Sequence, residues 1–152
     1  MQREFPTSPL IGVGAIVIDQ CRVLLVRRAQ EPMKGRWSIP GGLIELGESL
    51  RDGVIREVQE ETGLLVEPIE LIELLDRIDQ EGSRVRYHYV IADFLCCVKG
   101  GSFAAGSDAA EACWALRADL GSDSPLQLDP VTLRVLEKAW QRAEILSGKD
   151  LE

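Results

Sequence analysis

One segment, residues 42–63, constrains the fold more than any other part of the chain; it reads GLIELGESLRDGVIREVQEETG. Its centre has the pattern of a helix with two marked ends. Ser49, three residues before Asp52, forms a capping box, in which the hydroxyl accepts an otherwise unpaired N–H. Gly63 stands where a left-handed residue ends a helix. Apolar side chains recur at helical spacing between these ends and predict the buried face: Leu50, Val54, Ile55 and Val58.

The same helix carries three glutamates, Glu57, Glu60 and Glu61, within an arc of roughly 100°. Only Glu60 has a basic helical neighbour, Arg56, and Arg before Glu is the weaker orientation of such a pair. Two carboxylates about 5–6 Å apart repel by ~3 kcal/mol at an effective dielectric constant of ~20. A solvated acidic surface is the alternative interpretation, but it leaves this repulsion without compensation. Mg²⁺ would offset it, since it binds carboxylate oxygens and keeps waters and phosphates as its other ligands.

The fixed positions of this segment resemble the signature of the Nudix hydrolases. Gly42 is followed after five residues by Glu48, and after seven more by residues 56–64, which read REVQEETGL. The flanks are similar as well, because residues 37–42 (WSIPGG) resemble the lead-in to the signature and residues 111–114 resemble its later acid-then-Trp segment. Residues 1–152 are therefore interpreted as a single Nudix domain, with 1–9 and 148–152 expected to be loose.

The resemblance implies a phosphoanhydride hydrolase that uses Mg²⁺, with Mn²⁺ able to substitute. The residues expected to act in catalysis are Glu48, Arg56, Glu57 and Glu60. The expected metal ligands are the carbonyl of Gly41 and the carboxylates of Glu57, Glu60, Glu61 and Glu111. Arg56 and Glu48 are expected to orient the carboxylates. The general base is left open between Glu57, Glu60 and a later loop acid, Asp108 or Glu111, and either of these two acids could complete the metal site.

The remaining chain alternates strands and helices, which predicts an α/β fold with a mixed sheet and helices on both faces. The resemblance implies the same α/β/α sandwich, with the signature as loop, helix and loop. The expected strands are 10–18, 22–28, 64–79 with a break near Pro68, 84–98 and 111–116. Residues 79–83 are expected to form a hairpin loop, and Pro130 a helix start capped by Asp129. Strand alternation places Tyr87, Tyr89, Ile91 and Asp93 on one side of their strand.

Composition restricts the partners. A net charge of −8 disfavours long nucleic acid, whose binding depends on clustered Lys and Arg, but it permits a small nucleotide diphosphate bridged by cations. No apolar run is long enough for a membrane span. The four cysteines lack a C-x-x-C pair, which favours a reduced, cytoplasmic location. The isolated Gly12-x-Gly14 has no following helix pattern and is not a dinucleotide fingerprint. A homodimer is compatible with the sequence.

The substrate contacts expected from the sequence are Arg27, Trp37 and Arg86. For Trp37 the alternative is buried packing, and for Arg27, as for Arg28, it is an ordinary surface position. The stretches 85–89 and 107–114 resemble small Nudix proteins that act on ADP-ribose or nucleotide sugars. Because the chain contains no Asn, we expect little discrimination among bases and a preference for ADP-ribose over 8-oxo-dGTP. The alternatives are a pyrophosphatase of oxidised nucleoside triphosphates and a sensor that binds nucleotides without cleaving them.

Overall fold

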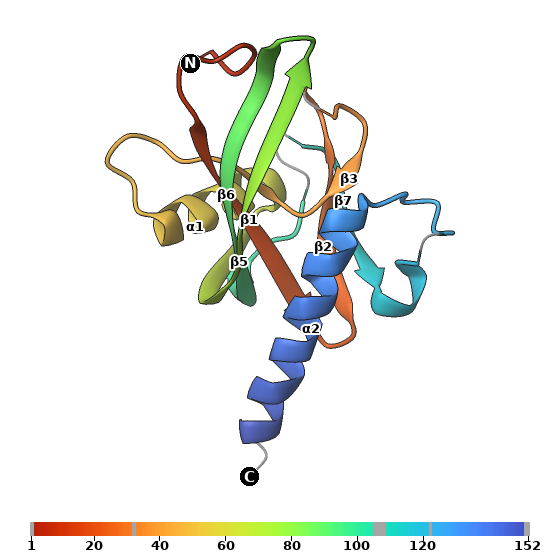
Figure 1. Cartoon of the computed structure of the whole chain (residues 1–152). Helices are drawn as coiled ribbons and strands as arrows, with labels where there is room; N and C mark the ends of the chain where they lie inside the picture. Colours follow the sequence, from red (N-terminus) through yellow and green to blue (C-terminus); the bar gives the residue numbers. More distant parts are fainter. Residues whose placement is uncertain (1, 32, 105–108, 122, 151–152) are drawn as a thin grey trace.

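The computed structural model of the chain describes residues 2–31, 33–104, 109–121 and 123–150. Its elements follow one another as drawn in Figure 1. They are β1 (Leu10–Asp19), β2 (Arg22–Arg28), β3 (Trp37–Ser38), β4 (Gly41–Leu43), α1 (Leu50–Thr62), β5 (Leu64–Glu81), β6 (Arg84–Gly101), β7 (Ala109–Leu116), the 3-10 helix η1 (Arg117–Asp119) and α2 (Pro130–Asp150). The predicted strands and both helices are confirmed, with some ends displaced.

The strands join into one mixed sheet, as predicted. Within the described residues it has seven strands, and its main path runs β3-β2-β1-β6-β5, with β4 also paired to β1 and β7 to β2. The pair β1 and β6 is parallel, whereas every other pair is antiparallel. Strand β1 thus lies at the centre, and β4 brings the start of the signature segment directly against it.

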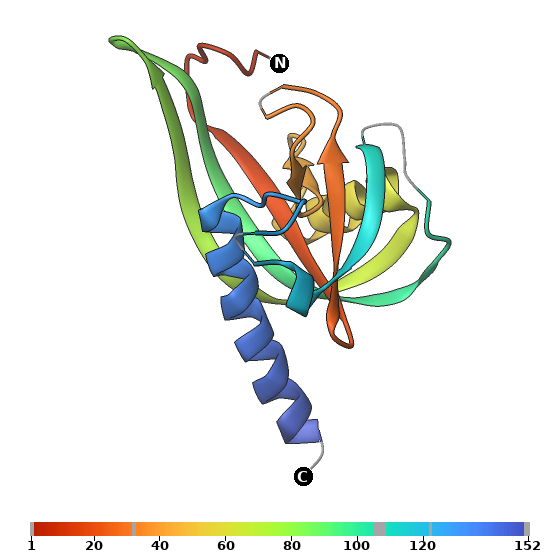
Figure 2. The ribbon, with the colours of Figure 1, turned by 90° about the vertical axis from the view of Figure 1, so that its right-hand side faces the viewer.

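Helices cover both faces of this sheet, which confirms the α/β/α sandwich (Figure 2). Val13 and Val17 of β1 pack in the core with Val58 of α1. Ile16, between them on the same strand, packs in the other core with Leu136 of α2, because successive strand residues face opposite sides. Burying one such aliphatic side chain contributes ~1.5–3 kcal/mol, so the two apolar cores fix α1 and α2 to the sheet.

Helix α1 begins and ends where the sequence predicted. The hydroxyl of Ser49 accepts a hydrogen bond from the N–H of Asp52 at 3.1 Å. Gly63 adopts φ +76°, and its N–H donates to the carbonyl of Gln59. These caps fix the rotation of the helix, so its glutamates have a defined position against β4.

Strands β5 and β6 form a hairpin that is longer than expected. Their pairing continues to Glu81 and Arg84, which corrects the predicted hairpin loop at 79–83. Gly82 has φ +62°, and this left-handed conformation permits a tight turn, so Gln80 and Glu81 remain paired. The predicted irregularity near Pro68 is confirmed as a register shift.

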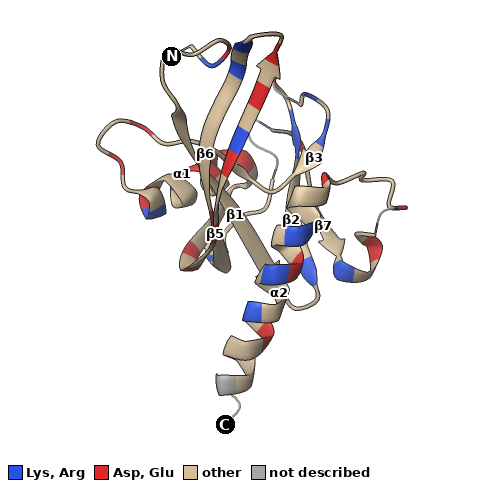
Figure 3. Ribbon diagram, viewed as in Figure 1, with Lys and Arg blue, Asp and Glu red and all other residues tan. Residues whose placement is uncertain are grey.

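Ion pairs join this hairpin to α2. Arg134 of α2 lies 2.6 Å from Glu73 of β5, and Arg142 lies 2.6 Å from Glu70. Figure 3 shows charged residues of both signs along α2 and the β5–β6 hairpin. Exposed pairs of this kind contribute at most about 1 kcal/mol each, so the apolar core remains the main source of stability.

The termini are more structured than the sequence suggested. The N–H of Phe5 donates to the carbonyl of Arg86 at 2.7 Å, and Glu4 forms an ion pair with the Arg86 side chain. The expected loose segment 1–9 is therefore attached to β6 at these residues. Helix α2 continues to Asp150, while residues 151–152 lie outside the described residues.

None of the helices in the described residues is both long and apolar enough to cross a membrane. The four cysteines are free thiols.

Gly63 and Gly82 provide a test of how α1 is joined to the sheet. Both have positive φ, but a Cβ on Gly63 would overlap the carbonyl oxygen of Ser102, whereas a Cβ on Gly82 would meet nothing within 4 Å. We predict that Gly63→Ala lowers the free energy of unfolding by roughly 3 kcal/mol, and Gly82→Ala by about 1 kcal/mol. Urea denaturation of both variants measures the difference, and equal losses would contradict the packing argument.

Candidate active site

Gly41 and Gly42 of β4 lie directly against the glutamates of α1. A Cβ on Gly42 would be 2.5 Å from the carboxyl carbon of Glu57. A Cβ on Gly41 would overlap the carbonyl oxygen of Val13 on β1. The N–H of Gly41 donates to Oε1 of Glu61 at 2.8 Å. Both glycines therefore allow a close approach that any side chain would prevent.

Arg56 binds several acceptors at once. Its Nε and Nη2 donate to the two carboxylate oxygens of Glu48 at 2.7 and 2.9 Å. Its Nη1 donates to Glu57 at 2.9 Å and to Glu60 at 3.3 Å. Nη2 also donates to the carbonyl of Leu43 at 3.0 Å. The planar guanidinium is suited to this arrangement, because its donors have a fixed fork geometry.

The sequence predicted contacts of Arg56 with Glu60 or Glu48, and both are present. The contact with Glu57 was missed, because adjacent helical residues do not normally face each other. The pKa of Glu48 is lowered to about 2, chiefly by the hydrogen bond from Arg56 and then by the N–H of Glu45. The hydrogen bond to Glu48 in turn raises the pKa of Arg56. Glu48 and Arg56 are therefore both charged at neutral pH.

The glutamates predicted to bind metal differ in burial and orientation. Glu57 and Glu61 are only 8% and 6% exposed, whereas the Glu60 side chain is 43% exposed. In the described part of the chain, no three His, Cys, Asp or Glu side chains are grouped so that they could hold a metal ion. The hydrogen bonds to Arg56 and to the Gly41 N–H account for the present orientations. The site has the hard oxygen donors that Mg²⁺ prefers, but the carboxylates would have to turn to share an ion.

Glu111, the expected downstream ligand, lies on β7 opposite Arg27 of β2. Its carboxylate is 2.9 Å from Nη1 of Arg27, and the Nε of Arg27 donates to the carbonyl of Gly35 at 3.1 Å. This ion pair with Arg27 was not predicted. Asp108, the alternative acid, lies outside the described residues, so the choice between the two remains open.

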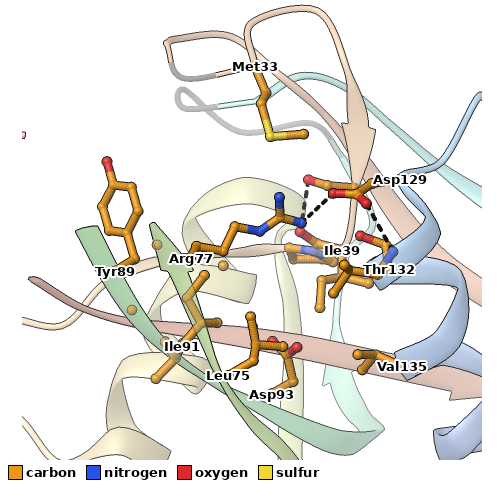
Figure 4. A pocket seen from close by; sticks show the side chains of 18 of the residues that line it. Met33, Ile39, Leu75, Arg77, Tyr89, Ile91, Asp93, Asp129, Thr132 and Val135 are labelled. Atoms are coloured by element: carbon orange, nitrogen blue, oxygen red, sulfur yellow. Dashed lines mark hydrogen bonds and ion pairs between the residues drawn. The ribbon is translucent and has the colours of Figure 1, made fainter. Parts of the chain in front are cut away.

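A cavity of about 170 Å³ lies beside Gly41 and Gly42. Its walls come from the strands β1 to β6 and from the start of α2 (Figure 4). Its aromatic and charged lining includes Arg28, Trp37, Arg77, Tyr89, Asp93 and Asp129. Because the two glycines border both the cavity and the glutamates, a ligand in the cavity would extend toward α1.

Of the expected substrate contacts, the structure brings only Trp37 to this cavity. Trp37 is also packed against the α2-side core, so both interpretations of this residue apply. Arg27 is paired with Glu111, and Arg86 is paired with Glu4 at 2.9 Å. Neither arginine is among the described residues that line the cavity.

Arg28 and Arg77 line the cavity instead. Burial lowers the pKa of Arg28, while the negative charge of Glu61 acts in the opposite direction, so Arg28 is electrostatically coupled to the α1 glutamates. Alternation alone could not select Arg28 over Arg27, because it places them on opposite faces of β2 without showing which face borders the cavity.

Asp129 caps α2, as predicted, and both of its carboxylate oxygens are engaged. Oδ1 accepts from the N–H of Val131 at 2.9 Å, and Oδ2 accepts from Nη2 of Arg77. Burial acts to raise the pKa of Asp129, but these hydrogen bonds outweigh it and lower the pKa. Asp129 therefore remains ionised and holds Arg77 at the cavity.

Asp93 is the second acid in the lining, and its environment is different. It is 5% exposed, and its pKa is raised to about 6, chiefly by burial and next by the charge of Glu73, with Arg77 acting in the opposite direction. Glu73 is its cross-strand partner. Strand alternation placed Asp93 on the same side as Tyr89, which the structure confirms because both line the cavity, but it gave no sign of a functional role.

We predict that Asp93→Asn makes the protein more stable at neutral pH. A raised pKa means that the folded state holds the proton of Asp93 more tightly than the unfolded state does. Stability is therefore lost as pH rises from about 4 to above 6, by about 3 kcal/mol in total. Urea denaturation at pH 4 and pH 7.5 measures the free energy of unfolding of both proteins. The variant should gain stability relative to the wild type as pH rises, and a difference that does not grow with pH would contradict the prediction.

Known proteins resemble this chain in sequence and in structure. A family model for the NUDIX domain matches residues 8–138. The ADP-ribose pyrophosphatase of Methanocaldococcus jannaschii is 36% identical over 104 residues, 68% of this chain and 60% of that protein. An 8-oxo-dGDP phosphatase of Homo sapiens is 34% identical over 136 residues, 86% of this chain and 38% of that protein. The chain thus spans only part of the length of these relatives.

The crystal structure of a MutT NUDIX hydrolase from Burkholderia pseudomallei has the same fold. It superposes with a TM-score of 0.73 at 28% sequence identity and covers 86% of this chain and 98% of that one. The family match, the mixed sheet between two helices and the glutamates of α1 against β4 lead to the same assignment. The chain belongs to the Nudix family.

Proposed function

We propose that the protein is a Mg²⁺-dependent hydrolase that cuts a phosphoanhydride bond in a nucleoside diphosphate linked to another group. One observation carries this proposal: Gly41 and Gly42 separate buried acids of α1 on one side from an aromatic and basic cavity on the other. A nucleoside in the cavity would extend its phosphates toward Glu57 and Glu61. This places a negatively charged group beside carboxylates, which is favourable only if cations intervene.

The ion would be held by the carboxylates of Glu57, Glu60 and Glu61 and by the carbonyl of Gly41, with Glu111 or Asp108 as the expected addition. When bound, Mg²⁺ polarises a phosphate and lowers the pKa of a coordinated water. The close approach of the Glu57 carboxylate to Gly42 supports this assignment, because a Cβ at Gly42 would displace the carboxylate.

Charged residues of the chain would position the substrate and the glutamates. Arg28 lines the cavity and is coupled to Glu61, so it is the cation best placed for the phosphates. Arg56 holds Glu48, which precedes α1, close to Glu57 and Glu60 in the later turns of the helix. The candidates for the general base that removes a proton from the attacking water are Glu57, Glu60 and a later acid, Asp108 or Glu111.

ADP-ribose or a nucleotide sugar is the proposed substrate. The aromatic faces of Trp37 and Tyr89 in the cavity are suited to a base or ribose, and the relative from Methanocaldococcus jannaschii is named an ADP-ribose pyrophosphatase. Oxidised guanine nucleotides are the second candidate, because the human relative is named an 8-oxo-dGDP phosphatase. A nucleotide sensor without hydrolytic activity is the third, but all the glutamates of the signature are retained. Mn²⁺ as a substitute, a cytoplasmic location and a homodimer remain predictions.

A direct comparison of substrates tests the proposal. The purified protein with Mg²⁺ should convert ADP-ribose into AMP and ribose 5-phosphate, with a kcat/KM above that for 8-oxo-dGTP. A preference for 8-oxo-dGTP of about tenfold, or 1.4 kcal/mol in transition-state binding, would favour the second candidate. No hydrolysis of any nucleotide with any divalent cation would favour the sensor.

We predict that Glu57→Gln and Glu61→Gln each reduce turnover by roughly 100-fold or more. The amide keeps the shape of the side chain but lacks the charge that a cation requires. In the absence of nucleotide, Mg²⁺ should raise the Tm of the wild type and have little effect on either variant, since only a ligand that binds the folded state stabilises it. Glu137→Gln, on the exposed surface of α2, is the matched control. Near-normal turnover of both variants would contradict the metal assignment.

Arg56→Lys should lower turnover by roughly tenfold or more, because Lys keeps the charge but loses the planar donors that hold Glu48 and Glu57. The Mg²⁺ concentration for half-maximal rate should rise as well. Arg117 is a suitable control, since it also binds two carboxylates, Glu137 and Glu144, on the surface. If Arg56→Lys and Arg117→Lys behave alike, Arg56 has no orienting role.

A further inference from the structure

Asp93 is a buried carboxyl group with no partner of its own. It forms no hydrogen bond or ion pair with any residue in the described part of the chain, although it is 5% exposed. Asp129, the other acid of the cavity, has both oxygens engaged by Arg77 and the Val131 N–H. A buried carboxylate is stabilised by hydrogen-bond donors, and because Asp93 lines the cavity, a ligand in the cavity can supply one.

Strand β1, which pairs with β6 beside Asp93, leaves room for this carboxyl group. Asp93 lies beside Gly14 of β1 in the parallel register. A Cβ at Gly14 would overlap Oδ1 of Asp93 and lie 2.8 Å from Cδ1 of Ile39. Any other residue at this position would displace the carboxyl group. Gly14 of the Gly12-x-Gly14 pattern thus has a structural reason, which is space for Asp93.

The surroundings of Asp93 suit a flat group with polar edges. The cavity walls near it are apolar, with Ile39, Leu75 and Ile91 among them. In Figure 4 the Asp93 side chain lies beside Leu75 and away from the pair formed by Arg77 and Asp129. A nucleobase can stack on such walls and present N–H donors at its edge, whereas a ribose would bring several hydroxyls against apolar carbon.

We propose that Asp93 reads the base of the substrate by accepting a hydrogen bond from its exocyclic amino group. This inference rests on the proposed function, because it assumes that the cavity receives the nucleoside. It differs from the expectation, based on the absence of Asn, that the protein discriminates little among bases. Adenine offers such a group at C6 and guanine at C2, beside the N1–H, and both fit the acceptor chemistry of a carboxylate.

Two matched pairs of nucleotides show whether Asp93 contacts the amino group of adenine or that of guanine. AMP and purine riboside 5′-monophosphate differ only by the amino group at C6, and GMP and IMP only by that at C2. In calorimetric titrations with Mg²⁺ present, the wild type should bind the amino member of at least one pair about tenfold or more tightly. These monophosphates have no phosphoanhydride bond, so the protein does not consume them during the titration. The pair that discriminates identifies the base. If neither pair does, the inference is overturned.

Asp93→Leu and Asp93→Ala should reduce this discrimination to about twofold or less, because neither side chain can accept a hydrogen bond. Two variants are used so that a packing defect in one does not decide the result. Asp76→Asn, an exposed acid on β5 outside the cavity lining, is the control and should retain the discrimination.

Failure of this inference is distinguishable from failure of the proposed function. Discrimination that persists in both Asp93 variants would overturn the role of Asp93 while leaving nucleotide hydrolysis intact. If the wild type neither binds any of the four nucleotides nor hydrolyses ADP-ribose, both the proposed function and this inference are wrong.

Discussion

The guanidinium of Arg56 holds together carboxylates that would otherwise repel one another. Glu48, Glu57 and Glu60 all accept hydrogen bonds from it, and Glu57 is buried against Gly42, where no side chain could be accommodated. The position of α1 against β4 therefore depends on this cation as well as on the apolar core. The arrangement also explains how the protein can keep these acids close together without a metal ion.

The central strand β1 links the acids to the cavity. Its residues alternate between the core under α1 and the core under α2. It pairs with β4, and its Gly14 makes room for Asp93 of β6. Arg28 adds an electrostatic connection, since it lines the cavity and is coupled to Glu61. Substrate binding and metal binding are thus expected to depend on the same few backbone contacts.

Local features of the fold could be predicted from the sequence. The caps of α1 at Ser49 and Gly63 and the cap of α2 at Asp129 involve neighbours along the chain, so residue type and spacing were sufficient. The two apolar cores followed from alternation and helical periodicity. The Nudix signature also predicted that Arg56 contacts Glu48, although the helix alone would have suggested only Glu60.

Contacts between distant residues were not predictable in this way. Arg27 pairs with Glu111 and Arg77 with Asp129 across large separations in sequence, and no local pattern reveals such partners. Alternation places Arg27 and Arg28 on opposite faces of β2, but the sequence does not show which face borders the cavity. The environment of Asp93 depends on the strand register and on the glycine beside it, so a carboxyl group in an alternating strand gave no indication of its burial.

The most direct test of the account is the location of a bound metal ion. Crystals soaked in Mn²⁺ should give an anomalous peak between the carboxylates of Glu57, Glu60 and Glu61 and the carbonyl of Gly41, with at least one carboxylate turned away from Arg56. An ion bound elsewhere, or no peak at these residues under conditions in which the protein hydrolyses its substrate, would contradict the account.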